Sequence, residues 1–364
     1  MKKTFALCLI FLSLFVTANA SAFDDLVPSV SYDETEFLTG SASLSALVDA
    51  IINGSEADFG GIMGRVLAYF LKEIKTAAAY TGAIVGFAML SACVKGSELS
   101  FVKSSAEMLF LVCYSVIAAF LLGILKSAAE AAFDAAGKIT DFVKMSVPAY
   151  IGIVSAAAPS FAGANTGGIF LITVNVMSSF AGDFMLNIFF CTGVLYIANH
   201  MSSEIHVLRL IELVRQTVFW ILGFLLTVFA GMTGLSGISA SVGAKSGMKA
   251  VKYTVGHAVP VVGGFLADSS ELIFSSFKIF KNAFGTAGII VIFSLCLVPV
   301  IKLFCAGIML KAASGICEPF CDKRISDCTA DVGQTIINIM ICVILLAVMF
   351  IFSLTVILLA ATGG

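Results

Sequence analysis

The stretch "VGQTIINIMICVILLAVMFIFSLTVILLAATGG" (332–364) contains no Asp, Glu, Lys, Arg or Pro. As a helix it would be roughly 50 Å long at about 1.5 Å per residue, whereas the hydrocarbon core of a bilayer is about 30 Å thick. Its residues do not alternate between apolar and polar as the strands of a membrane β-barrel do. The stretch therefore predicts a membrane-spanning helix and indicates an all-α fold.

Similar uncharged runs recur throughout the chain. They cover residues 76–94, 108–125, 145–182, 184–203, 216–244 and 282–301. Hydrophobic residues make up 59% of the sequence and charged residues 12%, whereas a soluble domain carries about 25% charged residues. We therefore expect a polytopic α-helical membrane protein with about six to eight spans.

The N-terminus has the features of a secretory signal. Two lysines precede the apolar stretch 4–16, and "TANASA" (17–22) follows it. This pattern predicts a signal peptide over residues 1–22 that is cleaved after Ala20 or Ala22. An uncleaved first span is the alternative. Cleavage would leave the mature N-terminus outside the cytoplasm.

An acidic segment follows the predicted signal. Residues 23–58 contain eight acidic residues and no Lys or Arg. This charge opposes nucleic-acid binding, because phosphate contacts require basic residues. We expect an extracytoplasmic leader here, followed by a polytopic membrane domain over residues 59–364.

Two charged segments have helical periodicity. The first, 126–144, carries charges four residues apart, which places them on one helical face: Lys126, Glu130, Asp134 and Lys138. The second, "EIHVLRLIELVRQ" (204–216), has apolar residues at helical spacing. Both segments predict amphipathic helices that lie along the bilayer surface or against a partner.

Proline and glycine interrupt two other apolar segments, 148–168 and 253–267. The second is too short to cross a bilayer as a helix. In it, Pro260 disfavours helix at the preceding residue, and Gly263 and Gly264 allow close approach of another backbone. We expect 253–267 to enter the bilayer partway and to pack against 148–168, where protein can satisfy the freed backbone groups. A short surface helix is the alternative.

No catalytic or cofactor motif is present. The histidines His200, His206 and His257 have no metal-ligand spacing, and the sequence lacks the usual hydrolase and nucleotide-binding patterns. We therefore expect neither enzymatic activity nor a cofactor.

Three cysteines lie in the polar stretch "CEPFCDKRISDC" (317–328): Cys317, Cys321 and Cys328. They could form one disulfide or contribute to a zinc site, but zinc would require a fourth ligand that no nearby residue provides. Free thiols are the default expectation.

Isolated charges near apolar segments are weaker candidates. Asp183 is the only charged residue within 145–203, and charge at membrane depth is costly and usually functional. A turn between two spans is the alternative location. Asp268 and Glu271 follow the interrupted segment and would suit either a proton or cation pathway or an ordinary surface helix.

The sequence "AVKYTVGHAVPVVGGFLADSSELIFSSFKIFKNAFGTAGIIVIFSLCLVPVIKLF" (250–304) resembles the stage III sporulation protein AE family of endospore-forming bacteria. The close resemblance covers roughly residues 230–320, and the signal, leader and multi-span body agree in layout. The matching residues are Pro260, Val261, Val262, Gly263, Gly264, Asp268, Lys281, Asn282, Ala283, Gly285, Pro299 and Lys302.

The resemblance implies a multi-pass protein of the mother-cell membrane that surrounds the forespore. Such proteins are similar in role to export-apparatus subunits. With other membrane subunits they form a channel-like complex that links the two cells and supports forespore development after engulfment. The alternative is a secondary transporter of a small solute or ion that uses the interrupted segments 148–168 and 253–267.

Overall fold

The computed structural model describes residues 59–96, 103–157, 175–176, 178–201, 207–229, 231 and 263–362. Every regular element in these ranges is helical, which confirms the all-α prediction. Five of the described helices are long and apolar enough to cross a membrane: Met63–Ala92, Val112–Ser146, Leu208–Phe229, Ala287–Cys317 and Lys323–Thr355. The expected total of about six to eight spans remains a prediction, because it covers segments outside the described residues.

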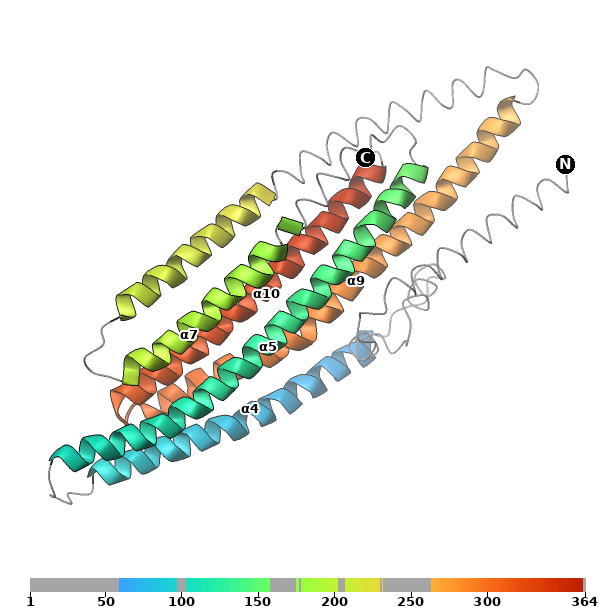
Figure 1. Ribbon diagram of the computed structural model, residues 1–364. Helices are drawn as coiled ribbons and strands as arrows, with labels where there is room; N and C mark the ends of the chain where they lie inside the picture. The colour runs from blue at the N-terminus through green and yellow to red at the C-terminus, as the bar shows by residue number, and fades with distance from the viewer. Residues whose placement is uncertain are drawn as a thin grey trace.

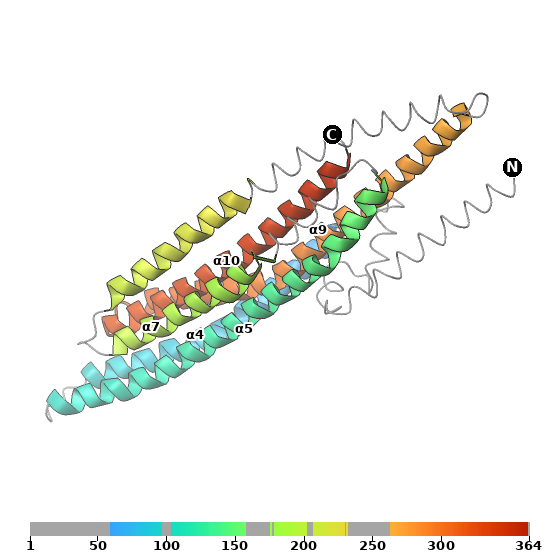
Figure 2. The ribbon, with the colours of Figure 1, turned by 45° about the horizontal axis from the view of Figure 1, so that its top comes forward.

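Two long helices lie side by side along one edge of the bundle (Figures 1 and 2). They are α4 (Phe59–Gly96) and α5 (Lys103–Ala157). The rings of Phe87 in α4 and Phe120 in α5 pack with centroids 5.7 Å apart. Away from their ends the two helices satisfy their backbone groups internally, and this makes long apolar helices compatible with a bilayer.

The C-terminal part of the chain forms a helical hairpin. α9 (Gly263–Cys317) and α10 (Lys323–Thr362) are joined by a short turn. The carboxylate of Asp322 caps the N-terminus of α10 by accepting a 3.0 Å hydrogen bond from the Arg324 N–H. Beyond the turn, the Ser314 hydroxyl donates to the Ser326 carbonyl at 2.8 Å, and the Ser326 hydroxyl donates back to the Ser314 carbonyl at 3.1 Å.

α10 lies at the centre of the bundle, in contact with α5, α7 (Leu186–Met201) and α9. A π-helical segment, η1 (Ser179–Met185), leads directly into α7. The helix Leu208–Phe229 lies outside α7 and α10 (yellow in Figures 1 and 2). The buried core is formed by large side chains from these helices, among them Leu121, Leu125, Phe189, Leu295, Ile336 and Phe350.

The prediction of a separate surface helix over 126–144 is wrong. This segment is the continuous middle of α5, and its alanine-rich face is buried in the bundle. The charge spacing nevertheless gives the expected ion pairs, Lys126–Glu130 at 3.7 Å and Asp134–Lys138 at 2.8 Å. Gly123 and Pro148 stand near the two ends of this charged stretch, but the helix continues through both of them.

The prediction of a separate surface helix over 204–216 is also wrong. From residue 208 onward this segment forms the start of the membrane-length helix Leu208–Phe229. Ile211 of this segment and Val218, two turns further along the helix, are buried against the bundle, at 1% and 3% exposed, whereas Leu210 is exposed. The stripe therefore marks contact with protein rather than with the bilayer surface.

The expected interruption does not begin at Pro148, because α5 remains helical through this residue to Ala157. Proline removes one helical hydrogen bond, but a membrane helix that stays continuous keeps its other backbone groups satisfied. α9 starts at Gly263. The remainder of the two interrupted segments, like the signal and leader over 1–58, lies outside the described residues, so partial membrane entry by 253–267 stays a prediction.

Candidate functional site: a polar cavity between two membrane-length helices

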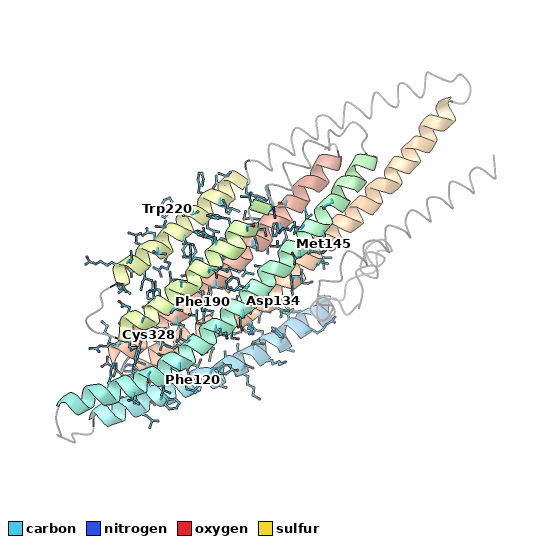
Figure 3. All side chains as sticks on the ribbon, in the orientation of Figure 1. Phe120, Asp134, Met145, Phe190, Trp220 and Cys328 are labelled. Atoms are coloured by element: carbon cyan, nitrogen blue, oxygen red, sulfur yellow. The ribbon has the colours of Figure 1, made fainter. Side chains whose placement is uncertain are left out.

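A cavity of about 1050 Å³ lies between the helix Leu208–Phe229 and α10. Its described lining residues are Glu212, Arg215, Gln216, Phe219, Trp220, Gly223, Phe224, Thr227, Gln334, Asn338 and Ile341. On both helices they recur every three or four residues, so each helix presents one continuous face to the cavity. Figure 3 shows Trp220 on the outer of the two helices.

The α10 side of the cavity carries two amide side chains one helical turn apart. Gln334 donates from Nε2 to Oδ1 of Asn338 at 2.9 Å, and its Oε1 accepts a hydrogen bond from Nζ of Lys311. Asn338 is 3% exposed. Its amide nitrogen makes no hydrogen bond to any described residue, although it can donate two.

The opposite wall changes character along its length. Glu212 and Arg215 lie one turn apart near the start of the helix, whereas Phe219, Trp220 and Phe224 follow further along it. The cavity is therefore charged at one end and aromatic toward the other.

A half-buried ionisable pair lies near the charged end. Nε2 of His200, at the end of α7, lies 3.7 Å from Oδ2 of Asp331 in α10. Nδ1 of His200 lies 2.9 Å from the Tyr196 carbonyl oxygen. Because a carbonyl oxygen only accepts, Nδ1 carries the proton in this contact.

Tyr114 fixes α7 against α5 and α10 next to this pair. Its hydroxyl donates to the carbonyl oxygen of Ile197 at 2.7 Å and lies 3.3 Å from Sγ of Cys328. The side chain is 1% exposed. One residue therefore joins three helices beside the cavity.

The three candidate cysteines do not share one polar loop. Cys317 is the last residue of α9, Cys321 lies in the turn, and Cys328 lies inside α10. All three are free thiols, and the described part of the chain contains no group of three or more His, Cys, Asp or Glu residues able to hold a metal ion. Burial raises the pKa of the Cys321 thiol, an effect partly offset by its hydrogen bond with Cys317.

Asp183 lies within η1, a π-helical segment continuous with α7, rather than in a turn between two helices. This segment is held to α5 by a 2.7 Å hydrogen bond from the Ser178 hydroxyl to the Thr140 hydroxyl. π-helical turns within helices often occur at functional sites. Asp183 therefore stays a candidate functional residue.

From Gly263 onward the family-like motif lies on α9, whereas Pro260, Val261 and Val262 are outside the described residues. Pro299 is buried within the membrane-length part of α9. None of the motif residues is among the described residues lining the cavity. The motif residues that precede the membrane-length part of α9 are Gly263, Gly264, Asp268, Lys281, Asn282, Ala283 and Gly285, and the separate candidate Glu271 lies there too.

Sequence reasoning missed the amide side chains of the cavity. Gln334 and Asn338 stand four positions apart in the charge-free apolar run at the C-terminal end of the sequence (332–364). Hydrogen-bonding side chains at that spacing within an apolar span indicate a protein contact or a wet cavity. This signal was present in the sequence.

A helical bundle whose described part contains five membrane-length helices, two of them flanking a polar cavity, indicates a polytopic α-helical membrane protein. The sequence profile of the stage III sporulation protein AE family matches residues 42–361. The chain belongs to this family, which confirms the resemblance seen in the sequence and associates the protein with sporulation. The stage III sporulation protein AE of Bacillus subtilis (strain 168) is 21% identical over 296 residues, covering 81% of this chain and 74% of the relative. No solved structure matches the chain.

Proposed function

We propose that this protein is a multi-span membrane subunit of a channel-like complex that links the mother cell and the forespore. In this role it supports forespore development after engulfment. The observation that carries the proposal is the family match, which extends over residues 42–361 and so includes nearly all of the membrane domain.

The architecture supports a membrane role. Four of the membrane-length helices come from α4, α5, α9 and α10, which pack on one another in one bundle. A buried core of this kind gives a subunit a fixed outer surface on which other membrane proteins can assemble. We place the protein in the mother-cell membrane around the forespore, with an extracytoplasmic mature N-terminus and other membrane subunits as partners. The proposed role is non-enzymatic and uses no cofactor.

The test is deletion of the gene in the host organism. We expect normal vegetative growth, completed engulfment under the microscope, and a heat-resistant spore count that falls far below that of the parent. Expression of the intact gene at another locus should restore the count. A normal spore count in the deletion strain would contradict the role, and a growth defect in rich medium would indicate a general transporter instead.

A further inference from the structure

The cavity between the helix Leu208–Phe229 and α10 offers hydrogen-bonding groups to an occupant. Asn338 lies near the middle of the span Lys323–Thr355 and is 3% exposed. It lines the cavity, and no described residue accepts a hydrogen bond from its amide nitrogen. Hydrocarbon offers no hydrogen-bond acceptor, so a lipid chain at this position would leave the amide unsatisfied at a cost of several kcal/mol.

The charged end of the cavity offers one cation and one anion. Arg215 and Glu212 both line it, and within the described residues neither is part of an ion pair. The nearby carboxyl group of Asp331 already faces His200 at 3.7 Å. An occupant with both a carboxylate and an ammonium group would therefore complement Arg215 and Glu212 together, and guanidinium groups bind carboxylates with two parallel hydrogen bonds.

The size and remaining walls suit a small organic solute. Small-molecule sites typically have volumes of about 300–1,000 Å³ and combine apolar walls with a few polar groups. This cavity, at about 1050 Å³, is slightly larger than that range. Its aromatic side chains, Phe219, Trp220 and Phe224, provide the apolar walls.

We propose that this cavity binds small zwitterionic solutes of the amino-acid class. Arg215 binds the carboxylate, Glu212 binds the ammonium group, and Asn338 donates to a polar side chain of the solute. The inference rests on the proposed function for its biological setting, because it names the class of solute that the membrane subunit holds.

The first experiment is equilibrium dialysis of the purified full-length chain in detergent micelles against L-glutamine. Two analogues each lack one charge: L-glutaminamide has no carboxylate, and N-acetyl-L-glutamine has no ammonium group. We expect saturable binding of L-glutamine with a Kd below about 1 mM, and each analogue to bind at least about tenfold more weakly.

Two variants test which residue binds each charged group of the solute. Arg215→Gln should weaken L-glutamine binding about tenfold and remove the preference for L-glutamine over L-glutaminamide, while the preference over N-acetyl-L-glutamine remains. Glu212→Gln should show the reverse pattern. A structural defect would weaken all three probes alike, so the exchange of preferences is specific to direct contact.

The matched control is Lys126→Gln, which removes an exposed charge of α5 that lies outside the described cavity lining. It should leave all three affinities unchanged. Elution volume and thermal unfolding verify that each variant is folded. If Arg215→Gln does not fold, the Glu212→Gln variant decides, because residue 212 is exposed.

The proposal is overturned by the absence of saturable binding below about 1 mM, by equal affinity for the three probes, or by unchanged preferences in both variants. Phospholipid that co-purifies with the parent but not with Arg215→Gln, in place of L-glutamine binding, would assign the cavity to a lipid headgroup and also overturn it. The spore count of the deletion strain is independent of these results. Lost spores without L-glutamine binding reject this inference alone, whereas normal spores reject the proposed function.

Discussion

Gly307 of α9 and Gly333 of α10 bring two membrane-length helices into backbone contact. A Cβ added to Gly333 would lie 3.0 Å from the carbonyl oxygen of Gly307, and one added to Gly307 would lie 3.2 Å from the carbonyl oxygen of Gly333. Small residues at helix crossings in membranes allow this approach, since lipid provides no hydrophobic force between helices and close packing must provide the attraction. The crossing is adjacent to Gln334 and so fixes one wall of the cavity.

Gly333→Ala should destabilise the bundle by about 1–3 kcal/mol, because the new methyl group meets backbone that cannot move aside without shifting a helix. Thermal unfolding in detergent measures the effect. The control is Gly315→Ala, since a Cβ at this exposed position of α9 meets no atom within 4 Å. It should be neutral or stabilising by up to about 1 kcal/mol. Equal unfolding temperatures for the two variants would contradict the backbone contact.

Tyr114→Phe should lower the free energy of unfolding by about 1 kcal/mol, because the Ile197 carbonyl loses its 2.7 Å hydrogen bond from the hydroxyl group. Denaturant or thermal unfolding provides the measurement. Tyr80→Phe is the matched control, since Tyr80 is 53% exposed and should change the unfolding free energy little. An equal loss in both variants would show that Tyr114 does not link α5 to α7.

Alkylation should test the environment of Cys321. Burial raises the pKa of its thiol, and only the thiolate reacts. In a chain with Cys321 as its sole cysteine, maleimide should react more slowly at neutral pH than in denaturant. The folded rate should continue to rise at a pH where the denatured rate has levelled off, because the folded thiol loses its proton at higher pH.

Cys317, which is hydrogen-bonded to Cys321, provides the control for this experiment. The hydrogen bond with Cys317 lowers the pKa of Cys321. A background with Cys317→Ser retains a donor, whereas one with Cys317→Ala does not, so alkylation should be slower in the alanine background. Identical rates in folded and denatured chains would contradict the partial burial of the Cys321 thiol.

Pro148→Ala should preserve or raise stability and leave the spore count unchanged. α5 is helical on both sides of this residue, and alanine restores a helical N–H at a position where proline costs about 3 kcal/mol. Thermal unfolding and heat-resistant spore counts measure the two outcomes. A folded variant that fails to form spores would show that the proline itself is functional, in agreement with the interrupted segment inferred from sequence.

The all-α fold class was predictable because uncharged apolar runs of this length are typical of membrane-spanning helices. The ion pairs of α5 were predictable because side chains four residues apart share a helical face. The boundaries were not predictable. The charges of 126–144 indicated a surface helix, whereas one charged face is compatible with a buried opposite face of alanines in a longer helix. The cavity depends on which faces of two helices, more than a hundred residues apart in sequence, meet in three dimensions. Gln334 and Asn338 therefore stood out only after α10 was placed beside Leu208–Phe229.

The length of α9 has a mechanical consequence. Its membrane-length part is Ala287–Cys317, but the helix begins at Gly263 and its first turns extend beyond the other helices (Figure 1). At about 1.5 Å per residue this extension is about 36 Å long. A helix without a break acts as a lever, so a tilt of only about 10° within the membrane would displace its far end by about 6 Å. A small change in the tilt of the membrane-length part of α9 would thereby be converted into a larger movement of the far end of the helix.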